Sequence, residues 1–262
     1  VKHGLGKKFA LTLGIKTAKH EHLLLTDADC MPNSKDWVKL MSSNFNNAEI
    51  ILGYGAYERK KGLLNKIIRF DTFIIAQQYL SFALSGKTYM GVGRNLAYKK
   101  SLFFDNKGFA SHMHIASGDD DLFIQEISKE RSVAIEISNN SHTISEVMQS
   151  WKDWMYQKRR HLSTAPLYKN KFKVLLSLYP LFQFVFFLSL ILLVIFQSDL
   201  FYIIILLVIR LLISYITCYK QMKHLNVLDL YWVHPLYEFL HLLIQGKFVL
   251  LNLFSKPKRW SR

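Results

Sequence analysis

The chain has 262 residues, half of them hydrophobic, and its 34 Lys and Arg against 19 Asp and Glu give a formal net charge of +15. An excess of this size indicates an anionic partner, namely nucleic acid, an anionic substrate or an anionic membrane face. No basic nucleic-acid helix, zinc motif or RNA-binding motif accompanies it, and basic residues flank the apolar segments, so we exclude nucleic acid and favour a membrane. Two cysteines, Cys30 and Cys218, exclude a disulfide framework and indicate a reducing compartment.

The first residues resemble the middle of a domain. The chain begins at Val1, and no signal peptide is visible. We therefore expect an N-terminal part to be missing. Residues 9–19 then predict a helix with Leu11, Ile15 and Ala18 on one face.

A short apolar strand and two aspartates follow this helix. Residues 23–25 are all leucine, the run ends at Thr26, and Asp27 and Asp29 come directly after it. Ligands of α/β sheets bind beyond the carboxyl ends of the strands. Two carboxylates at that point form a hard oxygen site that suits Mg²⁺ or Mn²⁺ carrying a phosphate-bearing ligand. The alternative is that both aspartates are turn formers that cap the strand.

Helices and strands alternate along the next hundred residues, which predicts an α/β fold with a mostly parallel sheet. The helix over residues 63–84 is apolar but carries Lys66, Arg69 and Asp71, so we expect it to lie on a membrane rather than cross it. Two further helices are expected, one that ends at residue 45 and one over residues 119–129. Further strands are expected over residues 50–54, 96–98 and 133–137.

Three consecutive aspartates open the helix at residue 119. The helix dipole favours carboxylates at an N-terminus, so capping accounts for at least one of Asp119, Asp120 and Asp121. Three exceed what a cap needs, and their repulsion should raise the proton affinity of one carboxyl, as suits a general base. His112 and His114 lie just upstream, either solvated or in contact with an acceptor or a metal.

A basic segment follows an aromatic, interfacial stretch. Its members are Gln157, Lys158, Arg159, Arg160 and His161. They could form a basic collar at a membrane surface, an interpretation that suits Lys158 best. Alternatively, Arg159 and Arg160 could neutralise a diphosphate leaving group, because guanidinium is the bidentate partner of phosphate.

Two later segments are long enough to cross a hydrocarbon core roughly 30 Å thick. Residues 174–196 contain no charged side chain, and residues 200–219 contain only Arg210. Lysines flank the pair on both outer sides, so the positive-inside rule predicts that both flanks are cytoplasmic.

A third apolar segment covers residues 235–254. It carries Glu238, His241 and Lys247, and a basic tail follows it. Charges near a bilayer centre are costly, so we expect this segment to lie in the cytoplasmic interface or to re-enter. The alternative is a third transmembrane helix whose polar groups face the other two.

Five short motifs, in this order, resemble the family 2 glycosyltransferases, above all their membrane-bound bacterial members. The likeness covers nearly the whole chain, and the order of the motifs before transmembrane helices makes it specific. The motifs are Gly6-Lys7-x-x-Ala10-Leu11, Thr26-Asp27-Ala28-Asp29, Gly93-Arg94-Asn95-Leu96-Ala97-Tyr98, Gly118-Asp119-Asp120-Asp121-Leu122 and Gln157-x-x-Arg160.

The resemblance implies a Rossmann-like GT-A domain over residues 1–165, lacking its first strands, and a membrane region over residues 166–262. It implies inverting, metal-dependent transfer from a nucleotide-diphosphate sugar to a lipid or glycan acceptor. The implied location is the inner membrane of a bacterium, as a multi-pass protein with a cytoplasmic catalytic domain.

On the donor side, the resemblance implies roles for five residues. Asp27 matches the nucleotide-contacting aspartate, and Asp29 matches the ligand of Mg²⁺ or Mn²⁺, with Asp27 beside it. Lys7 matches a lysine near the nucleotide, and Arg94 and Asn95 belong to the same nucleotide-sugar site.

On the acceptor side, Asp119 matches the catalytic base, with Asp120 as the second choice. Gln157 and Arg160 match the family's Gln-x-x-Arg-Trp element. His161 stands where polysaccharide synthases carry a tryptophan that stacks on the acceptor sugar, which argues against processive synthesis. The family's first strand, with its base-contacting aspartate, is absent.

Two other classes fit parts of the pattern. A haloacid-dehalogenase-like phosphatase also has D-x-D after an apolar strand, but it usually has threonine where this chain has Met31, and it leaves the membrane segments unexplained. The other class is a non-catalytic membrane protein with a degenerate transferase domain. The retained Asp27, Asp29 and Asp119 speak against it.

Overall fold

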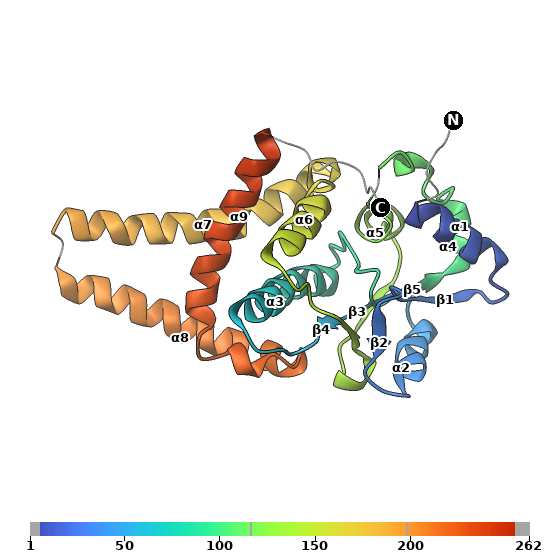
Figure 1. Ribbon diagram of the computed structural model, residues 1–262, viewed down its shortest axis with the longest axis horizontal. Coiled ribbons are helices and arrows are strands. Elements are labelled where there is room, and N and C mark those ends of the chain that lie inside the picture. Colours follow the sequence, from blue (N-terminus) through green and yellow to red (C-terminus); the bar gives the residue numbers. More distant parts are fainter. Residues whose placement is uncertain (1–5, 116, 198, 255–262) are drawn as a thin grey trace. The chain divides into compact units, whose positions relative to one another are not determined.

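The computed structural model describes residues 6–115, 117–197 and 199–254. These residues form two compact units that divide between residues 168 and 169 (Figure 1). The first unit mixes helices and strands, and the second consists of helices.

Two small sheets form the centre of the first unit. The core lies around one strand, in which Ile50, Ile51 and Leu52 have no exposed surface. The four-stranded sheet has the order β1 (His22–Leu25), β5 (Leu96–Lys99), β3 (Ile50–Gly53), β6 (Val133–Glu136), and the three-stranded sheet has the order β2 (Cys30–Pro32), β7 (Thr143–Ser145), β4 (Gly55–Tyr57).

The α/β class is confirmed, but the prediction of a mostly parallel sheet is wrong. β3 pairs with β6 and β4 with β7 in parallel, whereas β5 is antiparallel to β1 and β3, and β2 is antiparallel to β7. A short buried strand has the same apolar pattern in either direction, so the pattern predicts β5 without its direction. The reversal brings the start of β5 beside the end of β1, at one edge of the sheet.

The helices of this unit begin and end near the predicted residues. α3 has the predicted bounds, and α1 and α5 differ by two residues at each end, which is within the ordinary spread of helix ends. The helices are α1 (Lys7–Thr17), α2 (Trp37–Ser43), α3 (Leu63–Leu84), α4 (Lys100–Asp105), α5 (Asp121–Ile127) and α6 (Trp151–Leu162), with 3₁₀ turns at Asn44–Asn46, Ala110–His112, Asn139–Ser141 and Ala165–Leu167.

α3 is a core helix, and the prediction that it lies on a membrane is wrong. It packs against β4 and β6, and its charged Arg69 and Asp71 are buried. Asp71 Oδ2 lies 2.7 Å from Lys158 Nζ on α6. The interpretation of Lys158 as part of a membrane collar is therefore also wrong. Composition alone does not separate an interfacial helix from a core helix whose charges have buried partners.

The second unit consists of α7 (Asn170–Ile195), α8 (Leu200–His224) and α9 (His234–Phe254), with a 3₁₀ turn at Leu228–Leu230. α7 and α8 are long and apolar enough to cross a membrane, and no other helix in the described ranges meets the same criterion. Few side chains along their most apolar stretches are buried, whereas a core helix of a soluble protein is mostly buried. They include both predicted segments except residue 196.

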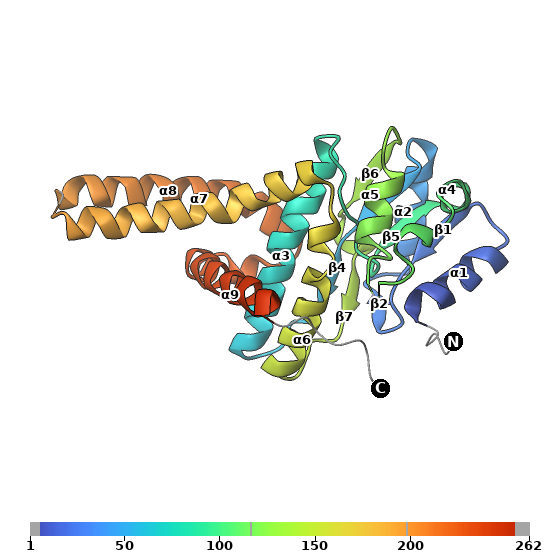
Figure 2. The same cartoon turned by 90° about the horizontal axis from the view of Figure 1, so that it is seen from above.

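α9 lies across the direction of α7 and α8 (Figures 1 and 2). Its Glu238 forms an ion pair with Arg210 of α8 at 3.0 Å and accepts hydrogen bonds from Gln183 Nε2 and Tyr179 OH of α7, at 2.6 and 3.1 Å. The polar groups thus face the other two helices, as the third-helix alternative requires. The crosswise direction instead fits a helix that does not cross the membrane beside them.

Candidate active site

Three segments that are far apart in the sequence meet at one lysine. Lys7 Nζ, in the first turn of α1, lies 2.7 Å from Asp27 Oδ1 and 2.9 Å from Asp119 Oδ2. Asp27 follows β1, and Asp119 precedes α5. Asp27 of the D-x-D motif and Asp119, the first aspartate of the acidic motif (residues 118–122), therefore share one ammonium group.

The direction of β5 explains why the D-x-D loop meets the Gly93-Arg94-Asn95 loop. Leu25, the last residue of β1, is paired with Leu96, the first residue of β5. The two loops therefore leave the sheet at the same edge, and Thr26 Oγ1 donates a hydrogen bond to Arg94 O at 2.9 Å. Thr143 Oγ1 donates to the same carbonyl at 2.8 Å, which ties in β7.

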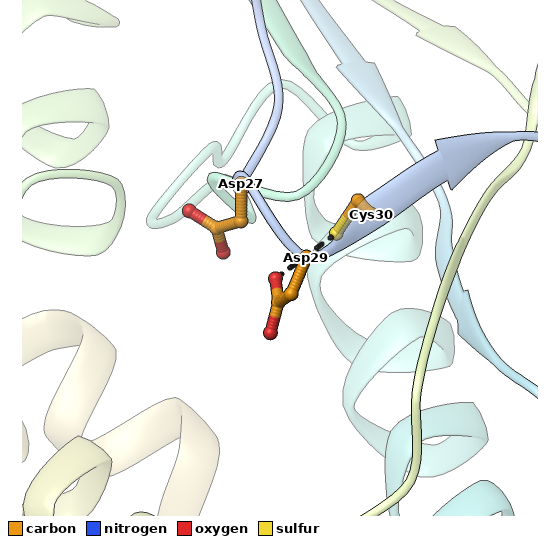
Figure 3. Close-up of side chains that lie close together, drawn as sticks. All are labelled: Asp27, Asp29 and Cys30. Carbon is orange, nitrogen blue, oxygen red and sulfur yellow. Dashed lines mark hydrogen bonds between the residues drawn. The ribbon is translucent and has the colours of Figure 1, made fainter.

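Asp27, Asp29 and Cys30 form a cluster whose potential ligand atoms lie within 4.8 Å of one another. The two carboxylates point the same way, with the Cys30 thiol beside Asp29 (Figure 3). Burial raises the pKa of the Cys30 thiol, which lies 3.0 Å from Ser145 Oγ. A protonated thiol is a poor ligand. The donors that remain are carboxylate oxygens, and these suit a hard divalent cation.

The three adjacent aspartates have three different environments. Asp121 is buried, and its Oδ2 accepts hydrogen bonds from Thr164 Oγ1 and from Tyr168 OH, the latter at 2.8 Å. Asp120 caps α5 by accepting from the Asp121 amide, and its Oδ2 accepts from Gly93 N at 2.9 Å. Asp119 is the member of the motif that faces Lys7.

Asp120 has an unusual proton affinity. Burial raises its pKa from 3.8 to about 7, and the charges of Asp119 and Asp121 add to the rise, against the opposing effects of Lys7 and the Gly93 amide. The sequence pattern predicted a raised proton affinity for one carboxyl of the three. Burial is the larger cause, and repulsion, the expected cause, comes second.

Two consecutive lysines connect α1 to this site. Burial lowers the pKa of Lys7, but its ion pairs with Asp119 and Asp27 more than offset this and raise the pKa above the ordinary value. Lys8 is buried, and its Nζ donates to His112 O at 2.6 Å and Ile115 O at 3.3 Å. Burial lowers the pKa of Lys8 to about 8. Lys8 was not predicted as a site residue, although it lies on the same buried face of α1 as Ile15, seven residues later.

The His112 ring lies against Gly118 of the acidic motif, and the alternative that His112 is solvated is wrong. It is buried, and its Nδ1 lies 2.8 Å from Ser111 Oγ and 3.4 Å from Glu126 Oε1. Gly118 sits against it with φ near +100°, where a Cβ would be strained and would lie 3.3 Å from the His112 ring. The motif therefore needs glycine before its first aspartate.

Arg94 and Asn95 leave the same loop for different surroundings. The Arg94 guanidinium lies 4.4 Å from the centre of the Tyr57 ring and donates to Ala56 O at 3.2 Å. Asn95 is fully buried, and its Nδ2 donates to Tyr54 O and Ser141 O at 3.1 and 2.7 Å. Its Oδ1 accepts from Trp37 Nε1 at 3.0 Å. The amide of Asn95 is thus engaged within the protein, where it orders the loop.

α6 contributes the basic residues of the last motif. Gln157 Oε1 accepts a hydrogen bond from Tyr57 OH at 3.4 Å, so Gln157 and Arg94 share one tyrosine. Arg159 and Arg160 are partly buried, and exposed His161 lies with its Nε2 3.2 Å from Arg160 Nη2. Thr164, just past the helix, bonds both His161 O and Asp121. The C-terminal end of α6 is therefore attached to the acidic motif.

No family model matches the chain, and no curated protein matches it significantly. Function is therefore inferred from the carboxylates, the lysines and the apolar helices themselves.

Proposed function

We propose that this chain is a metal-dependent inverting glycosyltransferase of the GT-A type, similar to the membrane-bound bacterial members of family 2. It would transfer a sugar from a nucleotide-diphosphate donor to a lipid or glycan acceptor. The observation that carries the proposal is the position of Lys7 between Asp27 and Asp119. Lys7 brings the D-x-D carboxylates, which would bind the donor, close to Asp119, a candidate base. A displacement reaction between two substrates needs its donor site and its base close together.

On the donor side, Asp29 and Asp27 would hold Mg²⁺ or Mn²⁺. When bound, the ion supplies Lewis-acid stabilisation of the diphosphate as the bond to the sugar breaks. Lys7 and Arg94 add positive charge for the same phosphates. Asn95 remains in the proposal as a residue that orders the loop, because its amide already has protein partners.

On the acceptor side, Asp119 or Asp120 would take the proton of the attacking hydroxyl. The bond from the acceptor oxygen to the sugar carbon forms on the face opposite the leaving diphosphate, which inverts the configuration. The raised pKa of Asp120, about 7, supports a carboxyl that exchanges a proton near neutral pH. Asp119 is supported by its position, because it is the aspartate that faces Lys7.

The end of α6 would serve the leaving group and the acceptor. Arg159 and Arg160 would neutralise the departing diphosphate, and Gln157 and His161 would contact the acceptor. Gln157 of α6 is hydrogen-bonded to Tyr57, whose ring packs against the Arg94 guanidinium, and Thr164, just past α6, is hydrogen-bonded to Asp121. These contacts support the assignment, because they connect the end of α6 to Arg94 and to the acidic motif.

The second unit would attach the enzyme to a membrane, which suits a lipid acceptor. We propose that α7 and α8 cross the inner membrane of a bacterium, with the first unit in the cytoplasm. Lysines at the start of α7 and at the end of α8 support this orientation through the positive-inside rule. If these helices cross, a crosswise α9 lies in the plane of the membrane, at its cytoplasmic interface.

The direct test is turnover of nucleotide-diphosphate sugars by the full chain in detergent, with Mn²⁺ or with a chelator. We expect turnover only with the metal, and Asp29→Ala should reduce it by about 100-fold or more. Asp36→Ala is the matched control, because Asp36 is exposed and its side chain caps nothing at the start of α2. Unchanged turnover with the chelator would refute metal-dependent transfer, and hydrolysis of phosphate monoesters without sugar transfer would favour a phosphatase.

A further inference from the structure

Lys7 binds the same carboxylate that the proposed metal would need. Its Nζ lies 2.7 Å from Asp27 Oδ1 and 2.9 Å from Asp119 Oδ2. A divalent cation at Asp27 would bind the same carboxylate group, and two positive charges on one carboxylate repel each other. The ammonium and the metal therefore compete for Asp27.

We propose that Lys7 is the counter-ion of Asp27 and Asp119 before the donor binds and changes partner when it does. Asp27 and Asp29 would then hold the cation, and the Lys7 ammonium would move from Asp27 to the diphosphate of the donor. Asp119 then loses its cationic partner only in the donor complex. This inference rests on the proposed function and adds to it an order of events, in which donor binding frees the acceptor-side carboxylate.

Local acidity makes such a counter-ion necessary. Asp27 and Asp29 lie one residue apart, and Asp119 shares the Lys7 ammonium with Asp27. Without a cation, carboxylates this close repel one another strongly. Lys8 is not the direct counter-ion of these carboxylates, because its ammonium is hydrogen-bonded to backbone carbonyls.

The two lysines differ in their freedom to move. The Lys7 side chain is 47% exposed and sits on the first residue of α1, so its long stem can swing without moving the helix. Lys8 is 4% exposed and is bound to His112 O and Ile115 O. Lys8 therefore anchors the start of α1 while Lys7 changes partner.

Competition can be measured without activity, by following free Mn²⁺ with electron paramagnetic resonance as it is titrated into the full chain in detergent. We expect Lys7→Met to tighten binding of Mn²⁺ alone by about tenfold, because its competitor is gone. Lys16→Met removes the same charge from an exposed position on the same helix and should leave the affinity within about twofold. Lys7→Arg keeps the charge and should behave like the wild type.

The second half of the experiment adds inorganic pyrophosphate to the Mn²⁺-saturated proteins. Here we expect the opposite effect, about tenfold weaker pyrophosphate binding by Lys7→Met, because the displaced ammonium is then missing from the phosphates. The unfolding midpoint of each variant is measured first, and Lys7→Gln replaces Lys7→Met if that variant does not fold.

Two outcomes overturn the exchange, and they are distinguishable. In the first, Asp29→Ala abolishes Mn²⁺ binding, but Lys7→Met does not tighten it more than Lys16→Met does. That result refutes the exchange and leaves the proposed metal site intact. In the second, the wild-type chain binds no Mn²⁺, or binds it equally well with Asp29→Ala. That result refutes both the exchange and the proposed metal role.

Discussion

At the scale of residues, three adjacent aspartates have separate tasks. Asp121 joins the acidic motif to Thr164 and Tyr168, Asp120 caps α5 and holds the Gly93 loop, and Asp119 faces Lys7. Sequence patterns predicted one cap and one carboxyl of raised proton affinity. They could not assign these properties, because each depends on a partner from a distant segment.

The raised pKa of Asp120 predicts a dependence of stability on pH. Between 3.8, its ordinary value, and about 7, the folded protein holds a proton that the unfolded chain releases. The free energy of unfolding should therefore fall as pH rises through this window and stay lower above it. Asp120→Asn cannot ionise and should remove this part of the slope in unfolding midpoints measured across pH, whereas Asp36→Asn should not. Equal slopes for Asp120→Asn and the wild type would contradict the assignment.

The choice of base predicts a contrast between two neighbouring variants. Asp119→Asn should lower turnover by about 10²- to 10⁴-fold while nucleotide-sugar affinity is kept, because the general base acts on the acceptor and not on donor binding. Kinetics with a parallel binding titration separate the two effects. If only Asp120→Asn behaves in this way, Asp120 is the base. Full turnover by both variants would mean that neither carboxyl takes the proton.

At the scale of elements, the reversed direction of β5 assembles the site. It brings the D-x-D loop and the Arg94 loop to one edge, where Thr26 binds Arg94 O. An apolar run before Asp27 and Asp29 predicted a strand that ends at these carboxylates, and β1 is that strand. Strand direction and the burial of α3 were not predictable, because both depend on which segments pack together and not on local pattern.

The buried pair between α3 and α6 predicts a stability effect that a surface lysine would not show. Lys158→Met leaves Asp71 charged and without this partner in a site where both side chains are less than one-tenth exposed. We expect a loss of about 3–5 kcal/mol in the free energy of unfolding, largely recovered in the double variant Lys158→Met with Asp71→Leu. Lys152→Met, exposed on the same helix, is the control. Wild-type stability of the Lys158 variant in denaturant titrations would show that the pair contributes little.

At the scale of the whole molecule, the two apolar helices were predictable and the role of α9 was not. Two long apolar segments with at most one charged residue each predict α7 and α8. Glu238 argued against a crossing by the third segment, yet its carboxylate is paired with Arg210 and hydrogen-bonded to Gln183. A sequence pattern cannot show such partners, so the number of charged residues alone does not predict whether this segment crosses a membrane.

Topology is testable with single cysteines in a chain without Cys30 and Cys218. A cysteine at Gln197, in the connection between α7 and α8, should be labelled by an impermeant thiol reagent in intact cells. A cysteine at Ser261, which lies outside the described residues, should be protected, because an interfacial α9 leaves the basic tail in the cytoplasm. Labelling at both positions would instead show that α9 crosses the membrane.

The proposed function requires that the chain bind a nucleotide-diphosphate sugar together with a divalent metal. Thermal unfolding of the full chain in detergent tests this most directly. A panel of nucleotide-diphosphate sugars is added with Mn²⁺, with chelator, and to the Asp29→Ala variant. At a concentration 100 times its dissociation constant, a true donor stabilises the folded protein by about 2.7 kcal/mol. We predict such a shift for at least one donor, with Mn²⁺ only, and its loss in Asp29→Ala but not in Asp36→Ala. No shift with any donor, or the same shift with chelator present, would contradict the proposed function.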